Sequence, residues 1–221
     1  MGRERRVGDP DGPSEKFWED HYRGRAKRPS VRPGAVLAEV AGPLTPGSAL
    51  DLGCGEGGDA VWLATRGWRV TAVDVSETAL ERAAEHAAQA GVGDRVNVAR
   101  HDLGRSFPEG EFDLVSAQYL HSPVESFAEE RVLRRAADAV ASGGLLLVVG
   151  HASVAPWSWN RDRDVRFPTP GEVLGSIGLD MGLWDAEILD SPEREATRHT
   201  GPGGETATVT DNVVALKRLS R

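Results

Sequence analysis

Short apolar runs alternate with amphipathic stretches along the chain after Pro46. The runs have the length of strands, and the stretches repeat apolar residues at intervals of three and four, as helices do. This alternation is typical of strand-helix units that build a parallel sheet, and we expect six or seven strands. The sequence predicts strands at 49–52, 68–73, 96–99, 112–117, 145–149, 184–189 and 213–216.

Helices are predicted between these strands. One covers about 58–66, a second follows Ser76 as N-cap and stops at Gly91, and a third covers about 125–140. A short fourth helix follows Thr169 as N-cap, with Pro170 at its first position. Hydroxyl side chains are favoured N-caps and proline is favoured at the first helical position, so these starts have a physical basis.

The N-terminal residues and the stretch 151–169 do not follow the alternation of strands and helices. Residues 1–13 are rich in glycine, proline and charge and are expected to form a disordered tail, whereas 14–221 form a single domain. Aromatic residues within 14–45 predict a cap segment that docks on the domain. The irregular stretch 151–169 is a candidate substrate lid, or an exposed dimer contact, because it carries aromatic side chains: Trp157, Trp159 and Phe167.

Composition narrows the class of protein. The 221 residues hold 26 Lys and Arg against 34 Asp and Glu, a net charge of −8, which argues against nucleic-acid binding. The lone Cys54 cannot form an internal disulfide, and no Cys and His spacing indicates a metal site. Without a signal-like or membrane-spanning apolar run, we expect a soluble cytoplasmic protein, monomer or homodimer, that binds no membrane.

A glycine-rich loop follows the first predicted strand. Gly53, Gly55 and Gly58 satisfy G-x-G-x-x-G, a pattern that is weak alone and leaves a nicotinamide-dependent reductase open. Carboxylates at Asp51 and Glu56 bracket the loop and would repel a pyrophosphate. S-adenosylmethionine, which carries an ammonium and a sulfonium but no phosphate, fits the loop better than a dinucleotide.

Acidic residues also end the next two strands. Asp74 lies 21 residues after Gly53, where a carboxylate can accept hydrogen bonds from both ribose hydroxyls. Asp102 ends the third strand and can accept from an adenine amino group, while Leu103 covers the ring. Three successive strand ends therefore offer groups for the methionine, the ribose and the base.

These motifs resemble those of the class I S-adenosylmethionine-dependent methyltransferases over about residues 14–218. The resemblance rests on 50–57, 73–76 and 112–116, and the segment 17–22 followed by Arg32 is similar to small bacterial enzymes of the tellurite-resistance and thiopurine type. It implies an α/β, Rossmann-like fold: a seven-stranded, mostly parallel sheet with helices on both faces and an antiparallel last strand. It implies these cofactor contacts: Trp18, Tyr22, Arg32, Asp51, Gly53, Cys54, Gly55, Asp74, Val75, Asp102, Leu103, Gln118 and Tyr119.

The acceptor is expected beside the loops after the fourth and fifth strands. Methyl transfer needs alignment, exclusion of water and, for a hydroxyl, a base. His121 is the favoured base, with His151 and Tyr119 as further catalytic candidates; a thiol acceptor would need none. The chain lacks the Asn/Asp-Pro-Pro motif of relatives that methylate amino groups of bases or glutamine, so we expect a small-molecule acceptor. His121 could instead belong to a simple turn, and a non-catalytic cofactor-binding module stays possible.

Overall fold

The computed structural model describes residues 14–27, 32–122, 127–157, 166–195 and 205–220. The helices are α1 (Ser14–Arg23), α2 (Ala35–Ala41), α3 (Gly58–Thr65), α4 (Glu77–Gln89), α5 (Glu129–Asp138) and α6 (Pro170–Ile177). The strands are β1 (Ser48–Leu52), β2 (Arg69–Asp74), β3 (Val96–Arg100), β4 (Phe112–Gln118), β5 (Val140–His151), β6 (Trp184–Asp190), β7 (Glu193–Glu195) and β8 (Thr208–Arg218). The tail 1–13 and Trp159 lie outside the described residues.

The strands form one sheet with the order β3-β2-β1-β4-β5-β8-β6. Neighbours from β3 to β5 pair in parallel, and β8 pairs antiparallel with both β5 and β6. The predicted mostly parallel sheet with an antiparallel last strand is therefore confirmed. The short β7, which pairs with β8, was not predicted, because its sequence Glu-Arg-Glu carries no apolar signal.

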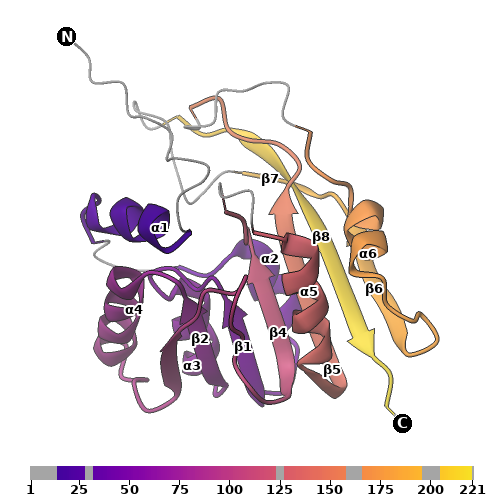
Figure 1. Ribbon diagram of the computed structural model, residues 1–221, viewed down its shortest axis with the longest axis horizontal. Helices are drawn as coiled ribbons and strands as arrows, with labels where there is room; N and C mark the ends of the chain where they lie inside the picture. The colour runs from indigo at the N-terminus through magenta and orange to yellow at the C-terminus, as the bar shows by residue number, and fades with distance from the viewer. Residues whose placement is uncertain (1–13, 28–31, 123–126, 158–165, 196–204, 221) are drawn as a thin grey trace.

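Helices cover both faces of the sheet. Side chains alternate along each strand, so Ala49 of β1 packs with α2 and α3 on one face, whereas Leu50 packs with α5 and α6 on the other. Figure 1 shows α5 and α6 in front of the sheet and α1 above the carboxyl ends of the strands, next to α4. Both faces of the sheet are thus buried, and its carboxyl edge is the place for a ligand.

The predicted starts of α4 after Ser76 and of α6 after Thr169 are confirmed in detail. The Ser76 hydroxyl accepts the Ala79 N–H at 3.2 Å, and Thr169 forms a capping box with Glu172. The third predicted helix, over 125–140, begins later and ends earlier than expected, because α5 covers Glu129–Asp138. Val140 already pairs with Phe112, because the strand that follows extends five residues further toward the N-terminus than its apolar run suggested.

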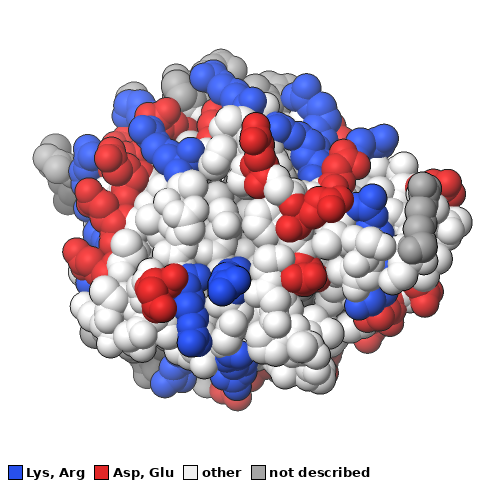
Figure 2. All heavy atoms as spheres, turned by 90° about the horizontal axis from the view of Figure 1, so that it is seen from below, with Lys and Arg blue, Asp and Glu red and all other residues white. Residues whose placement is uncertain are grey.

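The opposite, amino edge of the sheet is seen from below in Figure 2. On this face basic and acidic side chains are interspersed among uncharged surface. A hollow of about 290 Å³ lies at this edge, lined by side chains that include Arg134, Trp184 and Arg218, and none of the candidate site residues lines it. In the described part of the chain, no helix combines the length and apolar character needed to cross a bilayer.

Candidate active site

The loop between β1 and α3 adopts a conformation that only glycine takes readily. Gly53, Gly55 and Gly57 have φ values of 70°, 54° and 83°. A Cβ placed on Gly55 would lie 2.7 Å from the Tyr22 hydroxyl oxygen, closer than such atoms approach. The backbone amide of Cys54 donates to the Val73 carbonyl at 2.9 Å and pins the loop to β2. The loop therefore offers a bare backbone to a ligand and lies directly under α1.

Two buried carboxylates stand at the carboxyl ends of adjacent strands. Asp51 is 2% exposed and Asp74 is 7% exposed. Asp74 accepts the Gly55 N–H at 2.9 Å with one oxygen and the Ser76 N–H at 2.9 Å with the other. Burial raises the pKa of Asp74, and these hydrogen bonds oppose that rise. Asp74 thus orders the glycine loop, and its remaining lone pairs are those that ribose hydroxyls would use.

The residues predicted for adenine lie beyond β3. Asp102 accepts the Gly104 N–H at 3.1 Å and lies 3.4 Å from the Arg105 guanidinium. The Leu103 side chain packs into the core on the α5 face. Val75, a predicted cofactor contact that directly follows β2, is half-buried. The structure therefore places Asp102 and Leu103 at the same edge as Asp74, and the contacts of all three with the cofactor stay predictions.

Gln118 ends β4 with an incomplete set of hydrogen bonds. Its amide nitrogen donates to the Ser116 hydroxyl at 3.1 Å, while its Oε1 is buried and has no hydrogen-bond partner among the described residues. Because buried polar atoms are normally hydrogen-bonded, this amide oxygen could accept a hydrogen bond from a bound ligand. Together with the bare loop and two acids, it fits a ligand that carries donors and positive charge rather than phosphate.

Cys54 contributes shape rather than reactivity. Its thiol is buried, and burial together with the nearby Asp74 and Asp51 raises its pKa well above the ordinary value. A thiol in that state stays protonated and is a poor nucleophile. Cys54 is therefore a small side chain that fills the loop.

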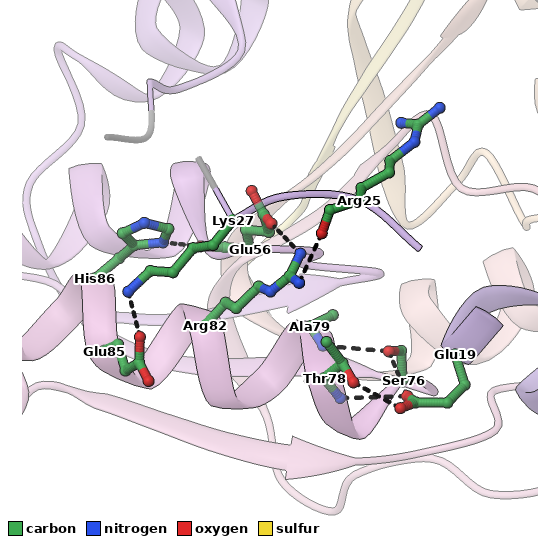
Figure 3. Close-up of polar contacts among 10 residues, drawn as sticks. All are labelled: Glu19, Arg25, Lys27, Glu56, Ser76, Thr78, Ala79, Arg82, Glu85 and His86. Atoms are coloured by element: carbon green, nitrogen blue, oxygen red, sulfur yellow. Dashed lines mark hydrogen bonds and ion pairs between the residues drawn. The ribbon is translucent and has the colours of Figure 1, made fainter. Parts of the chain in front are cut away.

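The cap helix α1 is held on α4 by an acid that the sequence did not single out. Glu19 accepts hydrogen bonds from the hydroxyls of Ser76 at 2.7 Å and Thr78 at 2.6 Å, and from the Thr78 N–H at 3.2 Å (Figure 3). The Thr78 hydroxyl is the main cause that lowers the pKa of Glu19 to about 2. Glu19 thus supplies a carboxylate to the N-terminus of α4, where negative charge is favoured.

A second contact joins the segment after α1 to the glycine loop. Arg82 of α4 pairs with Glu56 at 2.8 Å and donates to the Arg25 carbonyl at 2.9 Å (Figure 3). Lys27 pairs with Glu85 on the same helix. One guanidinium therefore binds both the loop and the cap segment, so Glu56, which the sequence placed beside a ligand, is engaged by the protein itself.

Arg32 lies on the other side of the loop. Its backbone carbonyl approaches Gly58 so closely that a Cβ on that glycine would lie 2.5 Å away, and its own side chain is exposed. Asp59, in the first turn of α3, accepts the Gly34 N–H at 2.6 Å. The chain around Arg32 is thus fixed by its backbone, and a cofactor contact from its guanidinium stays a prediction.

Aromatic rings gather where the acceptor is expected. Tyr119 and His151 have ring centroids 4.5 Å apart, and His151 lies 6.1 Å from Phe167 and 6.3 Å from His121. Trp18 of α1 meets His121 edge-on at 5.7 Å. Phe167, from the predicted lid, thus joins rings from the cap and from two strand ends. A planar acceptor would find ring faces here on several sides.

The imidazole of His121 has a defined hydrogen bond. Its Nδ1 lies 2.7 Å from the Tyr119 carbonyl oxygen. A carbonyl only accepts, so Nδ1 carries the proton and the neutral ring keeps its lone pair on Nε2. Burial, and then the neighbouring His121, lower the pKa of His151, which favours its neutral form. The site therefore holds one imidazole with an oriented basic nitrogen.

Two further polar residues, Asp211 and Arg194, lie beside Tyr119 in this cluster of rings, and neither was predicted from the sequence. Asp211, at the start of β8, is fully buried and accepts the Tyr119 hydroxyl at 2.7 Å, while Arg194 of β7 pairs with Asp211. The pair joins Asp211, which precedes an apolar run, to Arg194, which lies 17 residues earlier. Arg194 belongs to β7, and a strand of three residues is too short to be recognised in the sequence. In the described part of the chain, no three His, Cys, Asp or Glu residues are placed to hold a metal ion.

Comparisons with known proteins agree with this geometry. A family model described as a methyltransferase domain matches residues 49–144. The chain is 37% identical over 169 residues to 27-O-demethylrifamycin SV methyltransferase of Amycolatopsis mediterranei, covering 72% of this chain and 61% of that protein. The chain spans between 16% and 61% of the length of the curated relatives it matches.

Solved structures share the fold. A protein studied for the conversion of a disulfide bond into a thioacetal group during echinomycin biosynthesis superposes with a TM-score of 0.66 at 22% identity, covering 94% of this chain and 92% of that one. TehB from Haemophilus influenzae superposes with a TM-score of 0.63 at 17% identity, covering 91% of this chain and 67% of that one.

Proposed function

Because the chain belongs to the class I S-adenosylmethionine-dependent methyltransferases, we propose that it methylates a hydroxyl group on a small aromatic acceptor. The observation that carries this proposal is the His121 imidazole, whose Nδ1 is held by the Tyr119 carbonyl at 2.7 Å within a cluster of rings. The relative from Amycolatopsis supports an oxygen acceptor, since its name refers to an O-demethyl substrate.

The cofactor would lie along the carboxyl edge of the sheet. Asp51 and the bare glycine loop would hold the methionine end, Asp74 the ribose, and Asp102 with Leu103 the adenine. The buried Oε1 of Gln118 would take a donor beside the sulfonium. When bound, the sulfonium supplies an electrophilic methyl group without a metal.

His121 would remove the acceptor proton. A phenol has a pKa of about 10, so little phenolate exists near neutral pH. As the new carbon–oxygen bond forms and the methyl–sulfur bond breaks, the proton passes from the acceptor oxygen to Nε2. Such general-base assistance typically contributes about 10²–10⁴-fold. Trp18 and Phe167 would flank the acceptor and exclude water.

The test uses calorimetry with S-adenosylmethionine and methyl-transfer assays with a phenol and a thiol. The His121→Ala variant should lower turnover of the phenol by about 100-fold and leave the thiol and the cofactor affinity nearly unchanged. The thiol is the matched control, because it reacts without a base. Equal turnover of the phenol by variant and wild type would remove His121 from catalysis.

The binding data separate the alternatives. Absence of S-adenosylmethionine binding in the wild type would overturn the proposed function as a whole. Cofactor binding without methyl transfer to any phenol, thiol or amine would favour a non-catalytic binding module instead. Transfer to amines alone would contradict the hydroxyl acceptor.

A further inference from the structure

Tyr119 has a strained backbone at the centre of the candidate site. With φ at 52°, it is the only non-glycine residue with a positive φ in the described part of the chain. Its N–H donates to the Val149 carbonyl at 2.7 Å, which ties the turn to β5. A tyrosine keeps a left-handed conformation only where surrounding contacts impose it.

The contacts that hold Tyr119 from the other end come from β7 and β8. Its hydroxyl donates to Asp211 Oδ2 at 2.7 Å and accepts from Arg194 Nη2 at 2.7 Å. Arg194 Nη2 also donates to Asp211 Oδ1 at 3.0 Å. Because β8 runs antiparallel to β5, its first residues reach the carboxyl edge, and Asp211 lies directly opposite His151 in the sheet.

The fixed Tyr119 in turn orients both histidines. Its carbonyl, directed by the left-handed turn, lies 2.7 Å from His121 Nδ1, and its ring packs against His151 at a tilt of 31° with centroids 4.5 Å apart. Burial and the charge of Asp211 raise the pKa of the Tyr119 hydroxyl, which therefore stays protonated and acts as a donor rather than as a base. Tyr119 thus connects the Asp211 and Arg194 pair to the imidazoles.

We propose that Asp211 and Arg194 are positioning residues for methyl transfer: by fixing the Tyr119 side chain and turn, they keep the proton of His121 on Nδ1 and its lone pair on Nε2. This inference rests on the proposed function for its kinetic consequence. Its structural consequence, the tautomer of His121, does not.

The Tyr119→Phe variant tests the inference, because it removes the hydroxyl and leaves the buried ion pair together. In the wild type, ¹⁵N NMR of the imidazoles should find the His121 proton on Nδ1, and the variant should show a mixture of both tautomers. The phenol turnover should fall by at least about 10-fold with a shifted pH profile, and by more than the thiol turnover does.

Two controls accompany the variant. His86, whose Nδ1 lies 2.9 Å from the Glu56 carbonyl, should keep its tautomer in both proteins. Ser191→Ala removes a hydrogen bond to Asn212 in the same β7–β8 region without touching Tyr119, and should leave turnover and the His121 tautomer unchanged. A double variant, Asp211→Asn with Arg194→Gln, removes both charges together and should reproduce the Tyr119→Phe result.

The outcomes distinguish the two proposals. An unchanged His121 tautomer in Tyr119→Phe, or a wild-type proton on Nε2, would overturn the positioning role. A tautomer that responds as expected in a protein that methylates no hydroxyl would support the positioning of His121 and overturn the proposed function alone.

Discussion

Single residues at this site act through backbone geometry as much as through side-chain chemistry. Gly55 provides a left-handed turn, a clear space below Tyr22 and an N–H for Asp74. Tyr119 adopts a similar conformation without the freedom of glycine. The glycine avoids a cost of about 1–2 kcal/mol that other residues pay in this region, whereas the tyrosine is held there by its hydrogen bonds.

Replacing Gly55 by alanine should damage the cofactor site directly. The new methyl group would meet the Tyr22 hydroxyl, and the left-handed turn would be strained, so the affinity for S-adenosylmethionine should fall by at least about 10-fold, or 1.4 kcal/mol. Calorimetric titration measures this loss. Gly171→Ala is the matched control, since a Cβ at Gly171 meets nothing within 4 Å, and it should bind the cofactor like the wild type. Equal affinities for the two variants would contradict the role of the loop.

At the scale of elements, the cap helix α1 depends on polar anchors. None of its residues is fully buried, and its aromatic residues are half-buried, so polar contacts have a large share in its docking. Glu19 attaches it to the N-terminus of α4, and Trp18 on the neighbouring position reaches His121. The same helix therefore touches the elements expected to hold the cofactor and those expected to hold the acceptor.

The Glu19 contact should make the docking of α1 sensitive to acid. Its pKa is lowered to about 2 in the folded protein against an ordinary 4.5. The stabilisation is therefore complete above about pH 4.5 and is lost as the pH falls toward 2. At pH 7, Glu19→Gln should lower the free energy of unfolding by about 1 kcal/mol, the size of a partly screened hydrogen bond to a charged group.

Urea unfolding of wild type and variant at pH 7 and pH 3 measures this dependence, and the difference between them should shrink at the lower pH. Glu15→Gln on the same helix is the control, because Glu15 makes an exposed ion pair with Arg100 of β3. A difference that is equal at both pH values would contradict the charged state assigned to Glu19.

At the scale of the whole molecule, the candidate site is assembled from distant parts of the chain along one edge of the sheet. The carboxyl ends of β1, β2, β4 and β5 meet the start of the antiparallel β8 and the cap helix α1 (Figure 1). A ligand that binds at this edge would contact the strand ends and the cap helix together. Its binding should therefore stabilise the folded state as a unit.

Thermal unfolding tests which cofactor the molecule takes. S-adenosylhomocysteine at 100 times its dissociation constant should add about 2.7 kcal/mol, which raises the Tm of a chain of this size by about 5–10 °C. NADH should leave the Tm unchanged, because the buried carboxylate of Asp51 beside the glycine loop disfavours a pyrophosphate there. Stabilisation by NADH and none by S-adenosylhomocysteine would restore the reductase interpretation.

The sequence by itself determined the parallel strand-helix units, the capped helix starts and the glycine loop, because these depend on local signals. The antiparallel last strand was implied by the family resemblance, and α1 and α2 were not predicted as helices. Apolar periodicity, Ser76 and Thr169 as caps, and the acids Asp51 and Asp74 at strand ends are all readable from neighbouring residues. Their common edge follows from parallel pairing alone.

Only the tertiary structure decided the partners of these groups. Glu19 meets Ser76 across 57 positions, and Tyr119 meets Asp211 across 92. Such pairs form because β8 and α1 lie at the carboxyl edge of the sheet. The pattern of apolar and polar residues does not predict that placement. The orientation of His121, on which the proposed chemistry depends, follows from a strained turn that is held by contacts of Tyr119 with Val149 and Asp211.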